Sequence, residues 1–284
     1  MRSSDNDEIM NMKPNIILAS FPRSGNTFLR NILHSVYGRY SWNNIQNYNK
    51  KAAKLLSLSN LEKKGELTDK KKKLLSELRI KFQYRIIKTH ELPENILPFC
   101  DEKTHIIYLV RDGRDALVSM AHHRKDITEP GTKFLKNLEE SMISKGGSYF
   151  GGWSRNVEEW LKVADVVIRF EDIINDPIRF TETFSSFLEL PVPIKENIPT
   201  FKSQKEGNFL FGSKMNQAGE KESKAHSNKF FRKGKAGVWK KEMPSRLQKI
   251  FWKEHGHSMN QLAYFKDGAV SDFKLIIDPK KAEL

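Results

Sequence analysis

The sequence predicts an α/β fold in which a parallel central sheet is flanked by helices, within one domain that spans residues 1–284. Short apolar runs bounded by turn residues alternate with segments whose apolar residues recur at helical spacing, the order that produces parallel strands joined by helices. One run, 104–111, is almost continuously apolar, which is typical of a strand buried on both faces. A hydrophobic content of 38% in 284 residues provides enough apolar surface for a substantial core.

The predicted elements follow one another along the chain without an internal repeat. Each strand is a short apolar run that ends at a turn residue or a charge, and the four strands cover 15–20, 84–90, 104–111 and 165–170. Each helix has apolar residues on one face, and helices are expected at 27–37, from Arg114, at 153–163, from Asp176–Pro177 and at about 244–255. In a parallel sheet, ligands bind at the carboxyl ends of the strands, so we expect a binding site there.

Two segments depart from this alternation. Residues 43–82 are rich in Lys and Asn, and we interpret them as a variable Lys-rich insertion of one or two surface helices joined by a polar turn near Gly65. Residues 191–245 are basic and are predicted to be irregular.

The formal net charge of +14 indicates an anionic ligand or partner, because basic proteins attract nucleic acid, acidic lipid and anionic small molecules. Charge alone does not choose among these. Much of it lies in local runs, at 50–54, 63–64, 70–73 and 229–241.

The chain has features of a cytoplasmic protein. Its one cysteine, Cys100, excludes an intrachain disulfide and favours a reducing compartment. The first fifteen residues are polar and include acids, unlike a signal peptide. No run approaches the 18 apolar residues of a membrane span, so none is expected.

The segment FPRSGNT, residues 21–27, joins the first predicted strand to the first helix and has the composition of an anion-binding turn. A helix amino terminus offers unpaired N–H groups and a positive dipole end. Gly25 permits close backbone approach, Ser24 and Thr27 add hydroxyl donors, and Arg23 adds a permanent cation. An ordinary strand-to-helix turn is the alternative. The segment lacks the G-x-x-x-x-G-K-[ST] pattern of a Walker A loop.

The segment RDGRDALVS, residues 111–119, follows the third predicted strand. Arg111 ends that strand, and Ser119 lies two turns into the next helix. A chain reversal between them would bring both side chains to one anion. In the alternative interpretation, Arg111 is held by Asp112 or Asp115 and Ser119 lies on the helix surface.

Two further segments combine polar chemistry with strand ends or glycines. FRKGKAGVWK, residues 231–240, places cations beside two glycines, and either a solvated basic loop or a nucleic-acid patch is the alternative. KTHELP, 88–93, places His90 between Lys88 and Pro93 at the end of the second predicted strand. A lone histidine at such a position is more often structural than catalytic.

Taken in their order along the chain, the four segments resemble the motifs of the sulfotransferase family. FPRSGNT resembles the 5′-phosphosulfate loop, Y/F-P-K/R-S-G-x-T, and RDGRDALVS resembles the 3′-phosphate site, R-x-x-x-D-x-x-V-S. FRKGKAGVWK resembles the R-K-G-x-x-G-x-W-K signature, and KTHELP resembles the K-T-H-x-x-P stretch that carries the general base. The resemblance implies a P-loop NTPase-like sulfotransferase fold. It also implies 3′-phosphoadenosine 5′-phosphosulfate (PAPS) as cofactor, 3′-phosphoadenosine 5′-phosphate (PAP) as product, and no metal.

Weaker matches extend the resemblance to the adenine pocket. RFEDI, residues 169–173, resembles R-Y-E-D-L with Phe170 in place of the tyrosine, Phe28 stands where the family usually has tryptophan, and Thr200–Phe201 resembles T-S-F. The basic segment 191–245 is then expected to close over the cofactor. The implied cofactor-binding residues are Arg23, Ser24, Gly25, Asn26, Thr27, Phe28, Arg111, Ser119, Phe170, Thr200, Phe201, Phe231, Arg232, Lys233 and Gly234.

The implied catalytic residues are His90, Arg23 and Lys88. His90 would take the proton of an acceptor hydroxyl or amine, a role that suits histidine near neutral pH. Arg23 and Lys88 would stabilise the charge that builds up during transfer. Many family members have lysine at the position of Arg23, and arginine can stabilise charge but cannot donate a proton in practice. The sequence shows no cluster with metal-ligand spacing.

Three alternatives remain from the sequence. A P-loop nucleotide kinase would share the fold, but its Walker lysine is absent. A basic nucleic-acid-binding protein would account for the Lys-rich runs, yet the cations at 231–240 are interleaved with glycines rather than stacking aromatics, so no nucleic-acid partner is expected. A cofactor-binding protein without activity would not need both Lys88 and His90.

The acceptor is not identified by the sequence. A small molecule, a sugar and a lipid are all compatible with the residues expected near it, and the oligomeric state is open. The candidates for the acceptor side are Phe82, Met142, Tyr149, Phe150 and Trp153, with His122 and His123 close by in the sequence.

Overall fold

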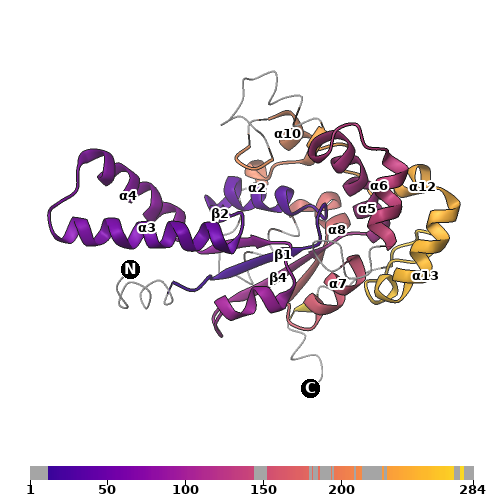
Figure 1. The fold of residues 1–284 in the computed structure, drawn as a ribbon, viewed down its shortest axis with the longest axis horizontal. Helices are drawn as coiled ribbons and strands as arrows, with labels where there is room; N and C mark the ends of the chain where they lie inside the picture. The colour runs from indigo at the N-terminus through magenta and orange to yellow at the C-terminus, as the bar shows by residue number, and fades with distance from the viewer. Residues whose placement is uncertain are drawn as a thin grey trace.

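The computed structural model describes residues 12–143, 152–178, 195–207, 209–212 and 229–271, together with 181, 185, 193, 226, 276 and 277. Its centre is a six-stranded sheet in the order β2-β3-β1-β4-β5-β6 (Figure 1). The strands are β1 (Ile16–Ser20), β2 (Ser41–Trp42), β3 (Ile86–Thr89), β4 (His105–Val110), β5 (Val166–Arg169) and β6 (Ile276–Ile277).

The predicted parallel sheet is confirmed for five of the six strands. β1 lies in the middle, with Ile17 opposite Ile87 of β3 on one side and Ile106 of β4 on the other. β2 and β5 extend the parallel sheet outward, and β6 pairs with β5 in the antiparallel direction. The sequence did not reveal β2 and β6, because two-residue strands carry no periodic signal.

Helices connect the strands and cover both faces of the sheet (Figure 1). Shorter turns of helix lie at η1 (Pro93–Asn95), η2 (Leu97–Phe99), η3 (Arg124–Thr128) and η4 (Lys195–Asn197). The helices are α2 (Asn26–Tyr37), α3 (Ile45–Lys63), α4 (Asp69–Phe82), α5 (Gly113–His123), α6 (Phe134–Ile143), α7 (Trp153–Leu161), α8 (Phe170–Asn175), α10 (Phe201–Glu206), α12 (Trp239–Glu242) and α13 (Ser245–Gln261).

Most predicted helices form close to their expected bounds. α2 ends at Gly38, which adopts the left-handed conformation (φ 65°) that favours glycine at a helix C-terminus. Two predictions differ. Phe170, expected to end a strand, begins α8, and α10 forms within a segment expected to be irregular. Most of the helix predicted from Asp176–Pro177 lies outside the described residues.

The Lys-rich segment forms two helices as predicted, α3 and α4, which extend together away from the sheet (Figure 1). The turn between them contains Gly65 at φ 73°. The pair is held by buried apolar side chains on the facing sides, including Leu58 and Leu78.

The sheet has an apolar core on each face, because successive residues of a strand point to opposite sides. Ile17 and Tyr108 belong to one core cluster, while their neighbours Leu18 and Ile107 belong to the other. Polar residues end or directly follow these apolar strands at their carboxyl ends. That is the predicted place for a ligand site. Within the described residues, no helix is both long and apolar enough to span a membrane.

Candidate active site

A cavity of about 900 Å³ opens at the carboxyl ends of the parallel strands. Arg23 follows β1, Lys88 and His90 stand at the end of β3, Arg111 follows β4 and Phe170 follows β5. The sheet order explains this convergence: β3, β1, β4 and β5 are neighbours, so their carboxyl ends lie side by side.

The turn between β1 and α2 has a backbone shaped for close contact. Arg23 (φ 68°) and Gly25 (φ 97°) both adopt the left-handed region. A Cβ atom on Gly25 would lie 2.2 Å from Cδ2 of Phe170, so only glycine fits. Arg23 is not glycine, and holding it at this φ costs on the order of 1 kcal/mol. Asn26 fixes the turn by donating from Nδ2 to the carbonyl oxygen of Leu18 at 3.1 Å.

The guanidinium of Arg23 lies across the cavity. Its Nη2 donates to the carbonyl oxygen of Phe230 at 2.7 Å and its Nε donates to Ser119 Oγ at 3.3 Å. Burial, together with the charges of Arg111 and Arg232, lowers the pKa of Arg23 to about 10. Cations from three separate segments are therefore close enough to repel one another.

Arg111 joins the turn after β1 to the basic segment at 231–240. Its Nη1 donates to the carbonyl oxygen of Arg23 at 3.1 Å, and its Nη2 donates to that of Lys235 at 3.2 Å. The guanidinium also lies 4.7 Å from the ring centre of Phe170. Among the residues that the structure describes, its buried Nε has no hydrogen-bond partner, and neither has Oγ of Ser24.

Arg111 Nε and Ser24 Oγ are buried donors that an anionic nucleotide could satisfy. A buried donor without a partner costs about 1–3 kcal/mol. Phosphate oxygens accept hydrogen bonds from guanidinium and hydroxyl groups, and a helix amino terminus at Asn26 is directed to the same place. The residues present therefore fit a phosphate-bearing ligand.

The motif at 231–240 is held in position by Asp115, a residue of α5. Its carboxylate accepts hydrogen bonds from the backbone N–H of Gly237 at 2.6 Å and from that of Trp239 at 2.9 Å. Gly234, in the same segment, adopts φ 58°, and a Cβ atom there would lie 2.2 Å from the ring of Phe201. Asp115 thus has a positioning role that the sequence pattern did not reveal.

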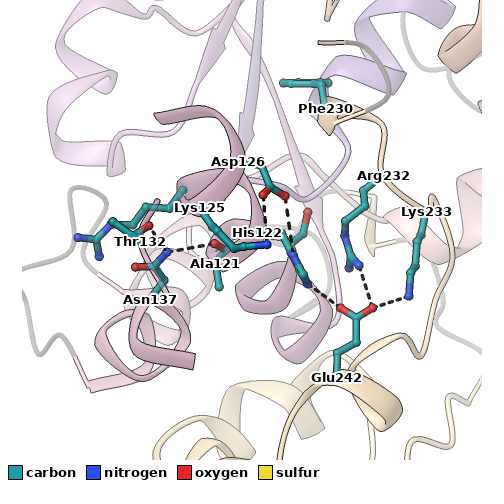
Figure 2. A network of polar contacts seen from close by, with 12 residues as sticks. Ala121, His122, Lys125, Asp126, Thr132, Asn137, Phe230, Arg232, Lys233 and Glu242 are labelled. Carbon is teal, nitrogen blue, oxygen red and sulfur yellow. Dashed lines mark hydrogen bonds and ion pairs between the residues drawn. The ribbon is translucent and has the colours of Figure 1, made fainter. Parts of the chain in front are cut away.

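The carboxylate of Glu242, in α12, binds the side chains of Arg232, Lys233 and His122 (Figure 2). Arg232 Nη1 lies 2.8 Å from Oε1, Lys233 Nζ contacts the same oxygen, and His122 Nε2 lies 2.9 Å from Oε2. Burial would raise the pKa of Glu242, but the hydrogen bonds from Arg232 and Lys233 lower it to about 2. The two cations of the R-K-G motif are thus anchored by one carboxylate.

His90 is oriented by the end of β1. Its Nδ1 lies 2.7 Å from the carbonyl oxygen of Ser20, which can only accept, so Nδ1 carries the proton. Burial and the charge of Lys88 lower the pKa of His90 to about 3, so the imidazole is neutral at pH 7 with its lone pair on Nε2. Burial and the charge of Arg30 lower the pKa of Lys88 to about 7.

Phenylalanines also line the cavity. Phe28 lies 6.4 Å from Phe170 and 5.9 Å from Phe201 between ring centres, and Phe201 lies 5.6 Å from Phe231. α10 is fixed to α2 by Gln204, whose Nε2 donates to the carbonyl oxygen of Phe28 at 3.1 Å. Flat apolar rings at this spacing offer a surface on which a planar base could stack.

The structure brings nearly all the predicted site residues together. Two predicted cofactor residues do not line the cavity: Ser24 is buried beside it, and Thr200 caps α10 by accepting from the N–H of Ser203 at 3.1 Å. Those that line it are Arg23, Gly25, Asn26, Thr27, Phe28, Lys88, His90, Arg111, Ser119, Phe170, Phe201, Phe231, Arg232, Lys233 and Gly234.

Fewer of the residues expected on the acceptor side line the cavity. Phe82, Met142 and Trp153 are buried in the core and do not line the cavity, and Tyr149 and Phe150 lie outside the described residues. His123 does line it, together with residues that the sequence did not single out: Arg30, Met120, Arg124, Thr128, Glu129, Glu140, Ser141 and Phe230. Within the described part of the chain, no group of His, Cys, Asp and Glu side chains could hold a metal ion.

A parallel α/β sheet with a cation-lined, aromatic-walled cavity at its carboxyl edge defines an enzyme class that handles anionic nucleotides. Comparisons with known proteins specify the family. The family model described as "Sulfotransferase domain" matches residues 13–262. The chain therefore belongs to the sulfotransferase family, and the sulfotransferase expected from the sequence is confirmed over the kinase alternative.

Individual relatives agree with this assignment. Sulfotransferase 1A1 of Bos taurus is 27% identical over 259 residues, which cover 86% of this chain and 83% of the relative. The crystal structure of mouse sulfotransferase SULT7A1 complexed with PAP shares the fold with a TM-score of 0.58 and 20% identity, covering 91% of this chain and 92% of that one. Retinol dehydratase, solved with androsterone and inactive cofactor PAP, has a TM-score of 0.55 and 22% identity, covering 89% and 83%.

Proposed function

We propose that this chain transfers a sulfuryl group from PAPS to a hydroxyl or amine of a small-molecule, sugar or lipid acceptor, with His90 as general base. The observation that carries the proposal is the convergence of Arg23, Arg111 and the motif at 231–240 on one cavity that also contains His90. The proposal treats residues 1–284 as one catalytic domain and the segment 191–245 as the part that closes over the cofactor. The single cysteine supports a cytoplasmic location.

The cofactor, when bound, supplies an activated sulfuryl group on its 5′-phosphate. The turn at 23–28 would hold that end with backbone N–H groups, the hydroxyls of Ser24 and Thr27 and the guanidinium of Arg23. Arg111, Ser119, Arg232 and Lys233 would hold the 3′-phosphate. Two related structures are complexes with PAP, and one of them also contains androsterone, which supports this choice of cofactor and a small-molecule acceptor.

The arrangement of His90 supports its role as base. The neutral imidazole holds its proton on Nδ1 against Ser20 and keeps a lone pair on Nε2, so it can receive a proton from an acceptor group. A pKa of about 3 makes it a weak base in the cavity alone. Negative charge from a bound cofactor would stabilise the imidazolium and thereby strengthen the base.

Arg23 and Lys88 would stabilise the negative charge that develops during transfer, and neither would transfer a proton. Both are buried in the cavity wall among other cations, an arrangement that is costly until an anion enters. Fixed cations of this kind stabilise developing negative charge without reorganising during the reaction. No metal is required for this role.

Calorimetric titration of the purified protein with PAP, and separately with ATP, in the absence of magnesium tests the proposal. We expect micromolar or tighter binding of PAP and much weaker binding of ATP, because only PAP carries a 3′-phosphate. Absent PAP binding, or a preference for ATP, would contradict it.

A further inference from the structure

Arg30 is a buried cation in the cavity wall that no motif predicted. It lies on α2, one residue beyond the apolar Leu29, and is only 5% exposed. Its Nε donates to Ser41 Oγ at 2.7 Å, and its Nη2 donates to the carbonyl oxygen of Ser41 and to Asn43 Oδ1, both at 2.9 Å. These partners are neutral, so they fix the guanidinium without cancelling its charge.

The remaining nitrogen of this guanidinium, Nη1, has no hydrogen bond to any described residue. The flat face of Arg30 lies 3.7 Å from the ring centre of Phe211, and the residue lines the same cavity as His90. A rigid, charged, partly engaged guanidinium at a cavity wall is well suited to hold a planar or tetrahedral oxyanion.

Lys88 is the second cation at this end of the cavity. The charges of Lys88 and Arg30 both act on His90, and the charge of Arg30 acts on Lys88. The charge of Arg23 also acts on His90, and Arg23 is itself repelled by Arg111 and Arg232. Arg30 and Lys88 thus line the same cavity as His90, and neither is among the implied cofactor-binding residues.

The carboxylates that line the cavity form ion pairs with a third cation, Arg124. Glu129 and Glu140 both bind Arg124, at 2.8 Å and 2.5 Å. Within the described residues, no carboxylate forms an ion pair with Arg30 or Lys88. The charge of Glu91 acts on Lys88 less strongly than the opposing charge of Arg30. Two buried like charges oppose each other, so an anion is the ligand that this region would stabilise most.

We propose that Arg30 and Lys88 form an oxyanion subsite beside His90, so that the preferred acceptor carries a carboxylate, phosphate or sulfate group in addition to the hydroxyl or amine that is modified. This inference rests on the proposed sulfuryl transfer. The bound sulfuryl group is itself an oxyanion and is the competing occupant of the subsite.

The test measures binding of matched acceptors to the PAP-saturated protein by calorimetry. One pair is methyl glucoside and its uronic acid, and the other is 4-hydroxyphenylethanol and 4-hydroxyphenylacetate. We expect the anionic member of at least one pair to bind about tenfold or more tightly than its neutral counterpart, a difference of about 1.4 kcal/mol. Equal binding of both members in both pairs, including binding too weak to detect, overturns the inference.

Variants separate the subsite from the rest of the protein. Arg30→Gln should abolish the preference for the anionic member, whereas Arg30→Lys, which keeps the charge, should retain part of it. Arg39→Gln is the matched control, because Arg39 also stacks on an aromatic ring, that of Tyr84, but does not line the cavity. A preference that survives Arg30→Gln in a folded protein, or that disappears in Arg39→Gln, contradicts the assignment.

The readouts distinguish this inference from the proposed function. PAP lacks the sulfuryl group, so Arg30→Gln should bind PAP within about twofold of the wild type. Wild-type protein that fails to bind PAP refutes the proposed function itself. If PAP binds normally and the anionic preference is absent while Arg30→Gln slows transfer to every acceptor equally, the subsite serves the sulfuryl group instead, and the acceptor inference is wrong.

Discussion

The carboxylate of Asp115 accepts a hydrogen bond from the backbone N–H of Trp239 at 2.9 Å and so joins two segments that are 124 residues apart in the sequence. A second bond, from the N–H of Gly237 at 2.6 Å, makes the connection bidentate. Arg111, which begins the same motif as Asp115, contacts the carbonyl oxygen of Lys235. The motif at 231–240 is therefore held against the start of α5.

Asp115→Asn tests this connection. The amide would direct an N–H group towards one of the two backbone donors, so we expect a loss of stability of about 1–3 kcal/mol and PAP affinity reduced by tenfold or more. Chemical denaturation and calorimetry measure the two effects. Asp267→Asn, at an exposed turn, is the control. Unchanged PAP affinity in Asp115→Asn would show that the segment does not depend on this bond.

Glu242→Gln should reduce thermal stability in a pH-dependent way. The pKa of Glu242 is lowered to about 2 from a usual value of 4.5, so its ionised form stabilises the folded state above about pH 4.5. This contribution is lost as the pH falls from 4.5 towards 2. We therefore expect a lower Tm than wild type at pH 7 and a difference that shrinks below pH 4.5. A Tm difference independent of pH would mean that the network contributes through packing, and Glu102→Gln serves as an exposed control.

His90→Ala should abolish transfer while leaving PAP affinity intact. General-base catalysis contributes typically 10²–10⁴-fold, so a rate loss of at least about 100-fold is expected in a transfer assay with radiolabelled PAPS. Calorimetry with PAP measures the second property. A variant that no longer binds PAP would indicate that His90 is structural, through its bond to Ser20.

Arg23→Lys and Arg23→Ala form a matched pair. We expect Arg23→Lys to retain activity, because its role is to stabilise charge, and Arg23→Ala to lose about 100-fold or more in kcat. Both replacements keep a β-carbon at φ 68°, so backbone strain is equal in the two variants. Comparable turnover of wild type and Arg23→Ala would remove Arg23 from the mechanism.

Lys88 should control the alkaline limb of the pH profile. Its pKa is lowered to about 7, so the ammonium form dominates below that pH and is lost above it. We expect kcat/KM for PAPS, which reports the free enzyme, to fall as the pH rises through about 7. Lys88→Arg, which stays charged, should move this fall to a much higher pH. An unchanged profile in Lys88→Arg would assign the limb to another group.

The four predicted strands and the first helix could be read from the sequence because local patterns define them. Apolar runs bounded by Pro22 or Gly113 are visible in a few residues, and periodicity over twelve residues defines α2. β2 and β6 could not be predicted, because their two residues form strands only through pairing with β3 and β5.

The motif residues were predictable for a related reason. Arg23 lies in the turn after β1, Lys88 lies near the end of β3 and Arg111 follows β4. The ends of neighbouring parallel strands must meet. Which of them touch could not be deduced. That Arg111 spans the backbone of Arg23 and Lys235 depends on how the segment at 231–240 folds back over the sheet.

The sequence by itself determined the α/β class, the order of the four predicted strands and the chemistry at the strand ends, since each follows from short-range patterns. Only the tertiary structure decided the partners of Asp115 and Glu242 and placed Arg30 in the cavity wall. Those roles depend on contacts between segments far apart in the chain, and on burial, which sets the strength of every charge in the cavity.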